Sequence, residues 1–220
     1  RLAKKFKVQP PAMIVVGKVV SLRKSFDWLR GKKIILYTGI NLDPNLEGII
    51  LHQPMIKIVP LKNFKPLDNE IKKITDYDFI IFNSRFGVKH FIERLLVLGY
   101  DTRVLAGVKL CAIGKTTASE LLNYSLKADV VAQDESSAGL ITALKILDLE
   151  NKHILITASN LSGTEEKIAL EKLGAKVTQV MTYLNIAPKI EKIDLNFIDE
   201  AYFLSPSGFN NFLKAYKNIP

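Results

Sequence analysis

The sequence is poor in the residues that build disulfides and metal centres. Its single cysteine, Cys111, lies in the largely apolar run 108–113, where a small core residue is expected rather than a nucleophile or a ligand. One cysteine excludes a disulfide framework and fits a reducing compartment. The three histidines, His52, His90 and His153, are far apart and follow no ligand spacing. The sequence therefore predicts no metal.

Long apolar runs and the common catalytic fingerprints are also missing. No run approaches the roughly 20 residues that cross a bilayer. Arg1 starts the chain without a Met or a signal-peptide pattern, so the sequence is expected to be a fragment of a longer protein. We also expect a cytoplasmic protein with no membrane contact. The glycine spacing matches neither a Walker loop nor GxGxxG, and no GxSxG elbow occurs. Nucleotide binding and serine hydrolase chemistry are therefore disfavoured.

Positive charge is abundant, because 31 Lys and Arg against 22 Asp and Glu give a net charge of +9. A basic protein often binds nucleic acid, a membrane surface or a polyanionic small molecule. The lysines are spread along the chain and no zinc-finger or RNA-binding signature occurs, which disfavours nucleic acid. A lysine-rich genome would explain the same excess.

An internal repeat links two distant parts of the chain. Residues 78–91, DFIIFNSRFGVKHF, recur as residues 199–212, DEAYFLSPSGFNNF. The matching positions are Asp78 with Asp199, Phe82 with Phe203, Ser84 with Ser205, Gly87 with Gly208, and Phe91 with Phe212. Each copy predicts a buried strand, a polar turn and a helix whose first N–H groups can bind an anion. The repeat predicts two lobes facing one ligand, with Ser84 and Ser205 on opposite lobes.

Short β-rich runs alternate with helical segments from residue 33 onward. The predicted strands are 34–37, 56–59, 79–82, 109–113, 130–132, 154–157, 177–183 and 201–204. Apolar residues recur at helical spacing between several of them, as in 88–96 and 140–147. This alternation predicts an α/β fold of parallel sheets flanked by helices, flavodoxin-like or Rossmann-like.

Two proline-containing segments, 59–68 and 184–192, each follow a strand and are predicted to cross between sheets. Residues 59–184 then form an inserted lobe 2. Lobe 1 is discontinuous and consists of residues 31–58 and 185–220. Residues 1–30 differ from the rest and form a separate leading segment.

Five predicted strand-to-helix turns are rich in Ser, Thr or Gly. Besides the two repeat copies, they are GKTT at 114–117, SSAG at 136–139 and SNLSGT at 159–164. Ordinary helix capping explains any one of them. All five would lie at the carboxyl ends of strands, where open α/β sheets bind ligands. Together they predict an anionic ligand.

The order of these motifs resembles the uroporphyrinogen-III synthase family. The motifs are FIIFNSRFGV at 79–88, AIGKTTASELL at 112–122, SSAGL at 136–140, LEKLGAKV at 170–177, MTYLNIAP at 181–188 and FLSPSGFNNFL at 203–213. The resemblance implies two α/β lobes joined by a two-stranded connector. It also implies a cofactor-free lyase of tetrapyrrole biosynthesis that cyclises linear hydroxymethylbilane to uroporphyrinogen III, inverting ring D and releasing water.

The leading segment is similar to another family. Residues 10–29, PPAMIVVGKVVSLRKSFDWL, resemble the end of the uroporphyrinogen-III C-methyltransferases. This implies a fused parent in which S-adenosylmethionine serves only the absent methyltransferase part; an ordinary leading strand and helix is the alternative. The synthase family continues with a second AIGxTTA turn after the SPSG helix, so lobe 1 is expected to be incomplete at Pro220.

The turns and the resemblance together assign the candidate site. Substrate carboxylates are expected at Ser84, Arg85, Thr116, Thr117, Ser137, Ser162, Gly163, Ser205, Ser207 and Gly208. Tyr183 matches the family's tyrosine beside the connector and is the expected proton donor to the leaving hydroxyl, with Thr117 as a second catalytic candidate by hydrogen bonding. A tyrosine that only packs between lobes is the alternative for Tyr183.

The expected partner is a linear tetrapyrrole polycarboxylate, bound by a monomer. A non-catalytic two-lobed binding module for an acidic metabolite would keep the turns without needing Tyr183. A receiver-like or flavodoxin-like regulator is disfavoured, because the sequence shows no acidic pocket and no flavin loop.

Overall fold

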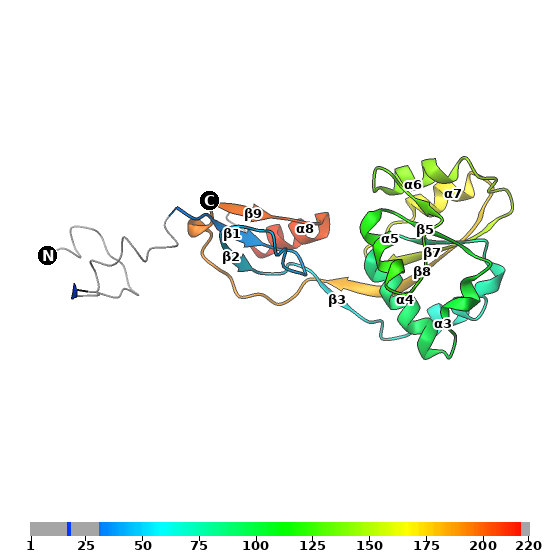
Figure 1. Cartoon of the computed structure of the whole chain (residues 1–220), viewed down its shortest axis with the longest axis horizontal. Coiled ribbons are helices and arrows are strands. Elements are labelled where there is room, and N and C mark those ends of the chain that lie inside the picture. The colour runs from blue at the N-terminus through cyan, green and yellow to red at the C-terminus, as the bar shows by residue number, and fades with distance from the viewer. Residues whose placement is uncertain (1–16, 19–30, 217–220) are drawn as a thin grey trace. The chain divides into compact units, whose positions relative to one another are not determined.

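The computed structural model describes residues 17–18 and 31–216, so the methyltransferase-like motif lies almost wholly outside the described residues. The chain divides into two compact units, drawn in Figure 1. The inserted unit is Met55–Ile190, and the discontinuous unit is Arg1–Pro54 with Glu191–Pro220. Each unit is described by itself.

A six-stranded sheet with the order β3-β8-β7-β4-β5-β6 forms the inserted unit. Its strands are β3 (Lys57–Val59), β4 (Phe79–Phe82), β5 (Lys109–Ala112), β6 (Val130–Val131), β7 (His153–Ser159) and β8 (Lys176–Ile186). Strands β4 to β8 pair in parallel, whereas β3 runs antiparallel to the end of β8. The carboxyl ends of the parallel strands therefore share one edge of the sheet.

Helices cover both faces of this sheet. They are α3 (Lys65–Ile71), α4 (Arg85–Val97), α5 (Lys115–Leu122), α6 (Ser137–Leu144) and α7 (Glu165–Glu171), with 3-10 turns at Ile74–Asp76 and Thr102–Leu105. Successive residues of a strand point to opposite faces. Ile80 and Phe82 accordingly pack with α3, α4 and α5, while Phe79 and Ile81 pack with α6 and α7. Figure 1 shows α6 and α7 on the other side of the sheet from α3 and α4.

The discontinuous unit contains a parallel sheet with the order β2-β1-β9. Its elements are β1 (Ile34–Tyr37), β2 (Ile49–His52), a 3-10 turn at Leu195–Phe197, β9 (Glu200–Tyr202) and α8 (Pro206–Ala215). Phe212 of α8 is buried and contacts the ring of Phe203, which follows β9. The core of this unit is therefore built partly from the second repeat copy.

The predicted repeat is confirmed at the level of atoms. Asp78 Oδ2 accepts the N–H of His153, the first residue of β7, at 2.9 Å. Asp199 Oδ2 accepts the N–H of Ile34, the first residue of β1, at 2.7 Å. Each aspartate fixes its strand against the neighbouring parallel strand, so β9 is the counterpart of β4 and β1 is the counterpart of β7.

The predicted fold class is confirmed, and every predicted strand overlaps an observed one. Strand β2 is not among the predicted strands. Strand β8 continues past the predicted end at Tyr183 because its last residues pair with β3, from Val59 opposite Leu184 to Lys57 opposite Ile186. The predicted domain boundaries, 58/59 and 184/185, fall within this two-stranded ladder.

Candidate functional site

Ser84 lies at the carboxyl edge of the inserted unit's sheet and begins helix α4. It has extended backbone geometry, and its Oγ accepts the N–H of Gly87 at 3.0 Å, which is the usual N-cap arrangement. A Cβ at Gly87 would lie 2.9 Å from Thr157 Oγ1, so the turn requires glycine there to pack against β7. The sequence pattern of Ser followed by Gly therefore predicts the local structure correctly.

The hydroxyl of Tyr183 lies 2.8 Å from Ser84 Oγ. Tyr183 belongs to β8, which is two strands from β4 in the sheet, and its side chain is buried. Two candidate residues that are far apart in sequence thus form one hydroxyl pair at the first turn of α4. The pair places a possible proton donor beside a helix start that can bind an anion.

Aromatic side chains from α4 enclose Tyr183 within the same unit. His90 stacks on its ring with centroids 5.9 Å apart and an interplanar angle of 24°, and Phe86 lies 6.0 Å away. Arg85, a predicted carboxylate ligand, lies over the Phe86 ring at 4.9 Å. Burial lowers the pKa of His90, and the nearby Glu93 carboxylate only partly offsets this effect. A neutral His90 therefore packs on Tyr183 at neutral pH.

A buried amide–carboxyl pair lies directly before this turn. Asn83 Nδ2 donates a hydrogen bond to Glu166 Oε2, and Glu166 is 8% exposed. Asn83 Oδ1 and Glu166 Oε1 are both buried and have no hydrogen-bond partner within residues 31–216. Burial raises the pKa of Glu166, although the Asn83 hydrogen bond opposes the shift. Neither Asn83 Oδ1 nor Glu166 Oε1 receives a hydrogen bond from the described residues. A proton on Glu166 Oε1 would turn that oxygen into a hydrogen-bond donor.

Replacing Glu166 by Gln should stabilise the protein at neutral pH and not in acid. A carboxyl whose pKa is raised by folding contributes its stability below its unfolded pKa, about 4.3 for Glu, and loses it as pH rises through the folded value. Glu166→Gln keeps a neutral group at all pH values, so we expect a gain on the order of 1 kcal/mol at pH 7.5 that fades below about pH 4.5. Urea unfolding of the wild type and of Glu166→Gln, at pH 7.5 and below about pH 4.5, measures this difference in the free energy of unfolding.

The matched control is Glu165→Gln, because Glu165 is the exposed neighbour in the same helical turn. That variant should show no such pH-dependent difference. A Glu166→Gln protein that is less stable than the wild type at pH 7.5 would show that Glu166 is needed as a carboxylate.

The second repeat copy forms the same turn in the discontinuous unit. Ser205 caps α8, with its Oγ accepting the N–H of Gly208 at 3.1 Å. Ser207 Oγ lies 3.3 Å from Ser205 Oγ. Pro206 occupies the first helical position, where a missing N–H costs nothing. Three predicted ligands, Ser205, Ser207 and Gly208, thus meet at one helix start.

The turns before α5 and α6 differ from these two. Ser136 caps α6, since its Oγ accepts the N–H of Gly139 at 3.0 Å, and Ser137, a predicted carboxylate ligand, is the first residue of the helix. Helix α5 begins after Gly114 without a side-chain cap, and Glu135 Oε1 accepts the N–H of Lys115 at 3.2 Å. A substrate carboxylate at this helix start would meet a carboxylate of the chain itself. The two predicted residues on α5 differ in burial. Thr116 is exposed to solvent, whereas Thr117 is buried, with 4% of its surface exposed.

The turn that contains Ser162 and Gly163 is closed by its own hydrogen bonds. Ser162 Oγ accepts the N–H of Ser159 at 2.9 Å, so it does not cap helix α7. The helix begins at Glu165 with two acidic residues in its first turn. Since acidic side chains already complement a helix start, this turn is the one least suited to a further carboxylate.

Thr38, which follows β1, is a polar residue at a strand end that the sequence patterns do not identify. Its Oγ1 donates to the carbonyl oxygen of Tyr202 at 2.7 Å, and the side chain is buried. The next residue is Gly39, where a Cβ would lie 2.7 Å from Leu204. The sequence feature that could have identified this residue is a Thr-Gly pair directly after a strand. In the structure, however, the Thr38 hydroxyl is bonded to the backbone of β9 and does not face solvent.

Within the described part of the chain, no group of three or more His, Cys, Asp or Glu side chains could hold a metal ion. Cys111 is fully buried in the core, as the sequence predicts, and this burial raises the pKa of its thiol to about 12. No helix among the described residues is long and apolar enough to cross a membrane.

Solved structures of other proteins share this fold. A mutant uroporphyrinogen III synthase from Thermus thermophilus matches with a TM-score of 0.59 and 17% identity, over 83% of this chain and 76% of that chain. Uroporphyrinogen-III synthetase from Helicobacter pylori matches with a TM-score of 0.54 and 17% identity, over 85% and 80%. At such identity these matches show the fold alone.

Sequence comparison finds longer relatives. A porphyrin biosynthesis protein HemD from Ruminiclostridium josui is 26% identical over 99% of this chain and 47% of its own length. A putative uroporphyrinogen-III synthase from Methanothermobacter thermautotrophicus is 23% identical over 67% of this chain and 60% of its own length. The chain thus spans about half the length of these curated relatives. The sequence model of the uroporphyrinogen-III synthase HemD family matches residues 45–219. The chain therefore belongs to the uroporphyrinogen-III synthase HemD family.

Proposed function

We propose that the protein closes hydroxymethylbilane into uroporphyrinogen III with loss of water. The observation that carries this proposal is the 2.8 Å contact between Ser84 Oγ and the Tyr183 hydroxyl at the first turn of α4. It combines a helix start suited to a carboxylate with a group that can donate a proton. A linear tetrapyrrole with acidic side chains and a terminal hydroxyl needs both.

Ser84 is placed to direct the proton of Tyr183. Because Ser84 Oγ already accepts the Gly87 N–H, its own hydrogen can be donated to the Tyr183 oxygen. The phenolic hydrogen is then available to the substrate's terminal hydroxyl, which leaves as water and gives an azafulvene. The substituted carbon of the last ring attacks the azafulvene, and the spiro intermediate fragments and recloses. Loss of a proton from the closed product restores Tyr183.

Positioning supplies much of the catalysis in this proposal. Well-oriented intramolecular reactions gain on the order of 7 to 11 kcal/mol. Ser84 and Arg85 at the start of α4 would hold a substrate carboxylate. Ser205, Ser207 and Gly208 form a turn of the same kind at the start of α8 and are proposed carboxylate ligands as well. Ser137 would add a contact at α6, and at α5 the exposed Thr116 would donate from its hydroxyl, since the Lys115 N–H is already bonded to Glu135. The proposed reaction uses no cofactor.

We also propose that the natural protein joins this synthase to a uroporphyrinogen-III C-methyltransferase. The support is the likeness of residues 10–29 to the end of that family, together with a relative that is about twice as long as the matched region. Peptide mass mapping of the natural protein would test this, since the proposal requires methyltransferase peptides in the same chain as Ser84.

A coupled assay that distinguishes the two porphyrin isomers tests the activity. Hydroxymethylbilane closes spontaneously to the type I product, so the natural protein carrying this sequence should shift the product to type III, and EDTA should not alter the rate. Equal isomer ratios with and without the protein would overturn the proposal. Binding of the substrate without turnover would support a non-catalytic binding module instead.

A further inference from the structure

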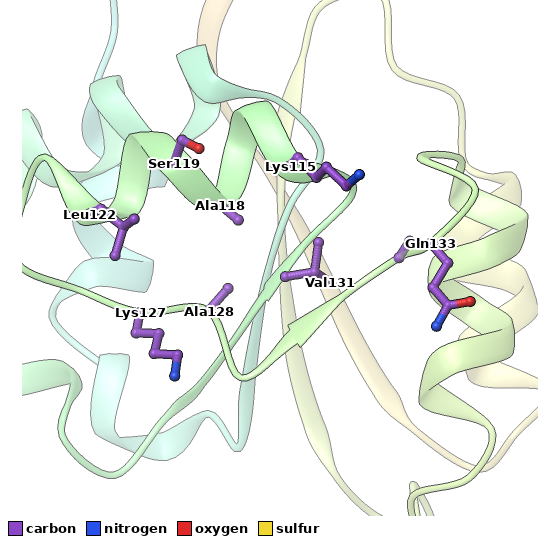
Figure 2. Close-up of a pocket in the computed structure, with 9 residues that line it drawn as sticks. Lys115, Ala118, Ser119, Leu122, Lys127, Ala128, Val131 and Gln133 are labelled. Atoms are coloured by element: carbon purple, nitrogen blue, oxygen red, sulfur yellow. The ribbon is translucent and has the colours of Figure 1, made fainter.

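A hollow of about 520 Å³ lies between α5 and the segment that contains the edge strand β6 (Figure 2). Ligand pockets commonly enclose about 300–1,000 Å³, so this hollow has the size for a small organic molecule. It is separate from Tyr183. The order β8-β7-β4-β5-β6 puts four interstrand steps between Tyr183 and β6, or roughly 19 Å at about 4.8 Å per step.

The facing walls of the hollow are apolar. Figure 2 shows Ala118 and Leu122 of α5 directed toward Ala128 and Val131 on the segment through β6. Two of these four wall residues are alanines, whose side chains are single methyl groups. Leu122 is 61% exposed and Val131 is 36% exposed, so water covers apolar surface there. An apolar ligand that displaced this water would be favoured.

The rim of the hollow is cationic. Lys115 and Lys127 lie at opposite ends of it in Figure 2, and both are exposed. Neither lysine forms a salt bridge within the described residues. Two carboxylates lie near this rim without forming a salt bridge to either lysine: Asp129 accepts the N–H of Leu110, and Glu135 accepts the backbone N–H of Lys115. Two exposed lysines thus stand at the rim of an apolar slot.

We propose that this hollow binds an organic anion with a flat apolar body, such as an aromatic carboxylate or sulfonate. The rings lie between the α5 wall and Val131, and the acidic groups pair with Lys115 and Lys127. A neutral body would leave the two charges unused, and a small inorganic anion would leave the apolar walls in water. The inference does not depend on the proposed synthase activity, because none of the residues used belongs to the Ser84 and Tyr183 site.

Fluorescence titration with 8-anilinonaphthalene-1-sulfonate tests the site, and N-phenyl-1-naphthylamine is the matched probe without the charge. We expect saturable binding of the anionic dye by the wild type. The double variant Lys115→Ala with Lys127→Ala should weaken the anionic dye about fivefold, since each exposed ion pair contributes modestly, and leave the neutral dye within about twofold. Ala118→Trp fills the slot and should weaken both dyes about tenfold or more.

The control removes two lysines elsewhere in the same unit, Lys172→Ala with Lys176→Ala, so the net charge matches that of the pocket variant. It should leave both dyes unaffected. The proposal is overturned if the wild type binds no anionic dye, if the control weakens it as much as the pocket variant does, or if Ala118→Trp leaves binding unchanged. Equal loss of the two dyes in the double lysine variant would also overturn it, because charge would then play no part.

Discussion

Tyr183→Phe should reduce turnover of hydroxymethylbilane about a hundredfold and leave KM nearly unchanged. The phenylalanine ring keeps the stacking on His90 and the contact with Phe86, so the local packing is retained. What is lost is the hydroxyl beside Ser84 Oγ. General acid catalysis typically contributes about 10²- to 10⁴-fold, and the lower end applies where positioning carries much of the rate.

The comparison of three variants separates catalysis from packing. Tyr124→Phe is the control, because Tyr124 lies in the same unit and its hydroxyl makes no hydrogen bond among the described residues; it should retain wild-type turnover. Ser84→Ala should lower turnover and also raise KM, since it removes both the partner of Tyr183 and a helix cap at the proposed carboxylate site. Unchanged turnover in Tyr183→Phe would leave Tyr183 with a packing role only.

The fold was largely predictable because its strands are marked by strong local signals. FIIF at β4 is buried on both faces, so its continuous apolar run has a single simple interpretation. Strand β2 is harder, since Ile49–His52 lies at an edge and is half exposed, with no clear alternation. The end of β8 was also hidden, because Leu184 to Ile186 become a strand only through pairing with β3.

Part of the local structure at the candidate site was predictable from the sequence, but the contacts between distant segments were not. Ser84 and Gly87 follow from capping chemistry, which is local. The contact of Ser84 with Tyr183 depends on β8, β7 and β4 being adjacent, and a single sequence does not reveal strand order. The same holds for the hydrogen bond between Asn83 and Glu166. It joins the turn after β4 to helix α7, which follows β7 in the sequence. Polar contacts between distant segments therefore required the structure.

Phe91→Ala should destabilise the inserted unit by about 3–5 kcal/mol, which is the usual cost of emptying a buried phenylalanine site. Phe91 is fully buried, and its ring meets that of Phe82 edge-on at 5.6 Å and 75°. The loss is large against a typical total stability of about 5–15 kcal/mol. Hydrogen exchange of peptides from β4 and β7 measures it, because these strands pack in the cores on either side.

Leu96→Ala on the same helix is the control, since Leu96 is 48% exposed and its truncation should cost less than about 1 kcal/mol.

The repeat extends the prediction to the discontinuous unit, where the ring of Phe212 meets that of Phe203 at 5.0 Å and 62°. Phe212→Ala should speed exchange in β1 and β9 as Phe91→Ala does in β7 and β4. If Phe91→Ala costs no more than Leu96→Ala, the aromatic pair is not what holds α4 on the sheet. If Phe91→Ala speeds exchange and Phe212→Ala does not, the aromatic pair stabilises only the first repeat copy, although both copies have the same geometry.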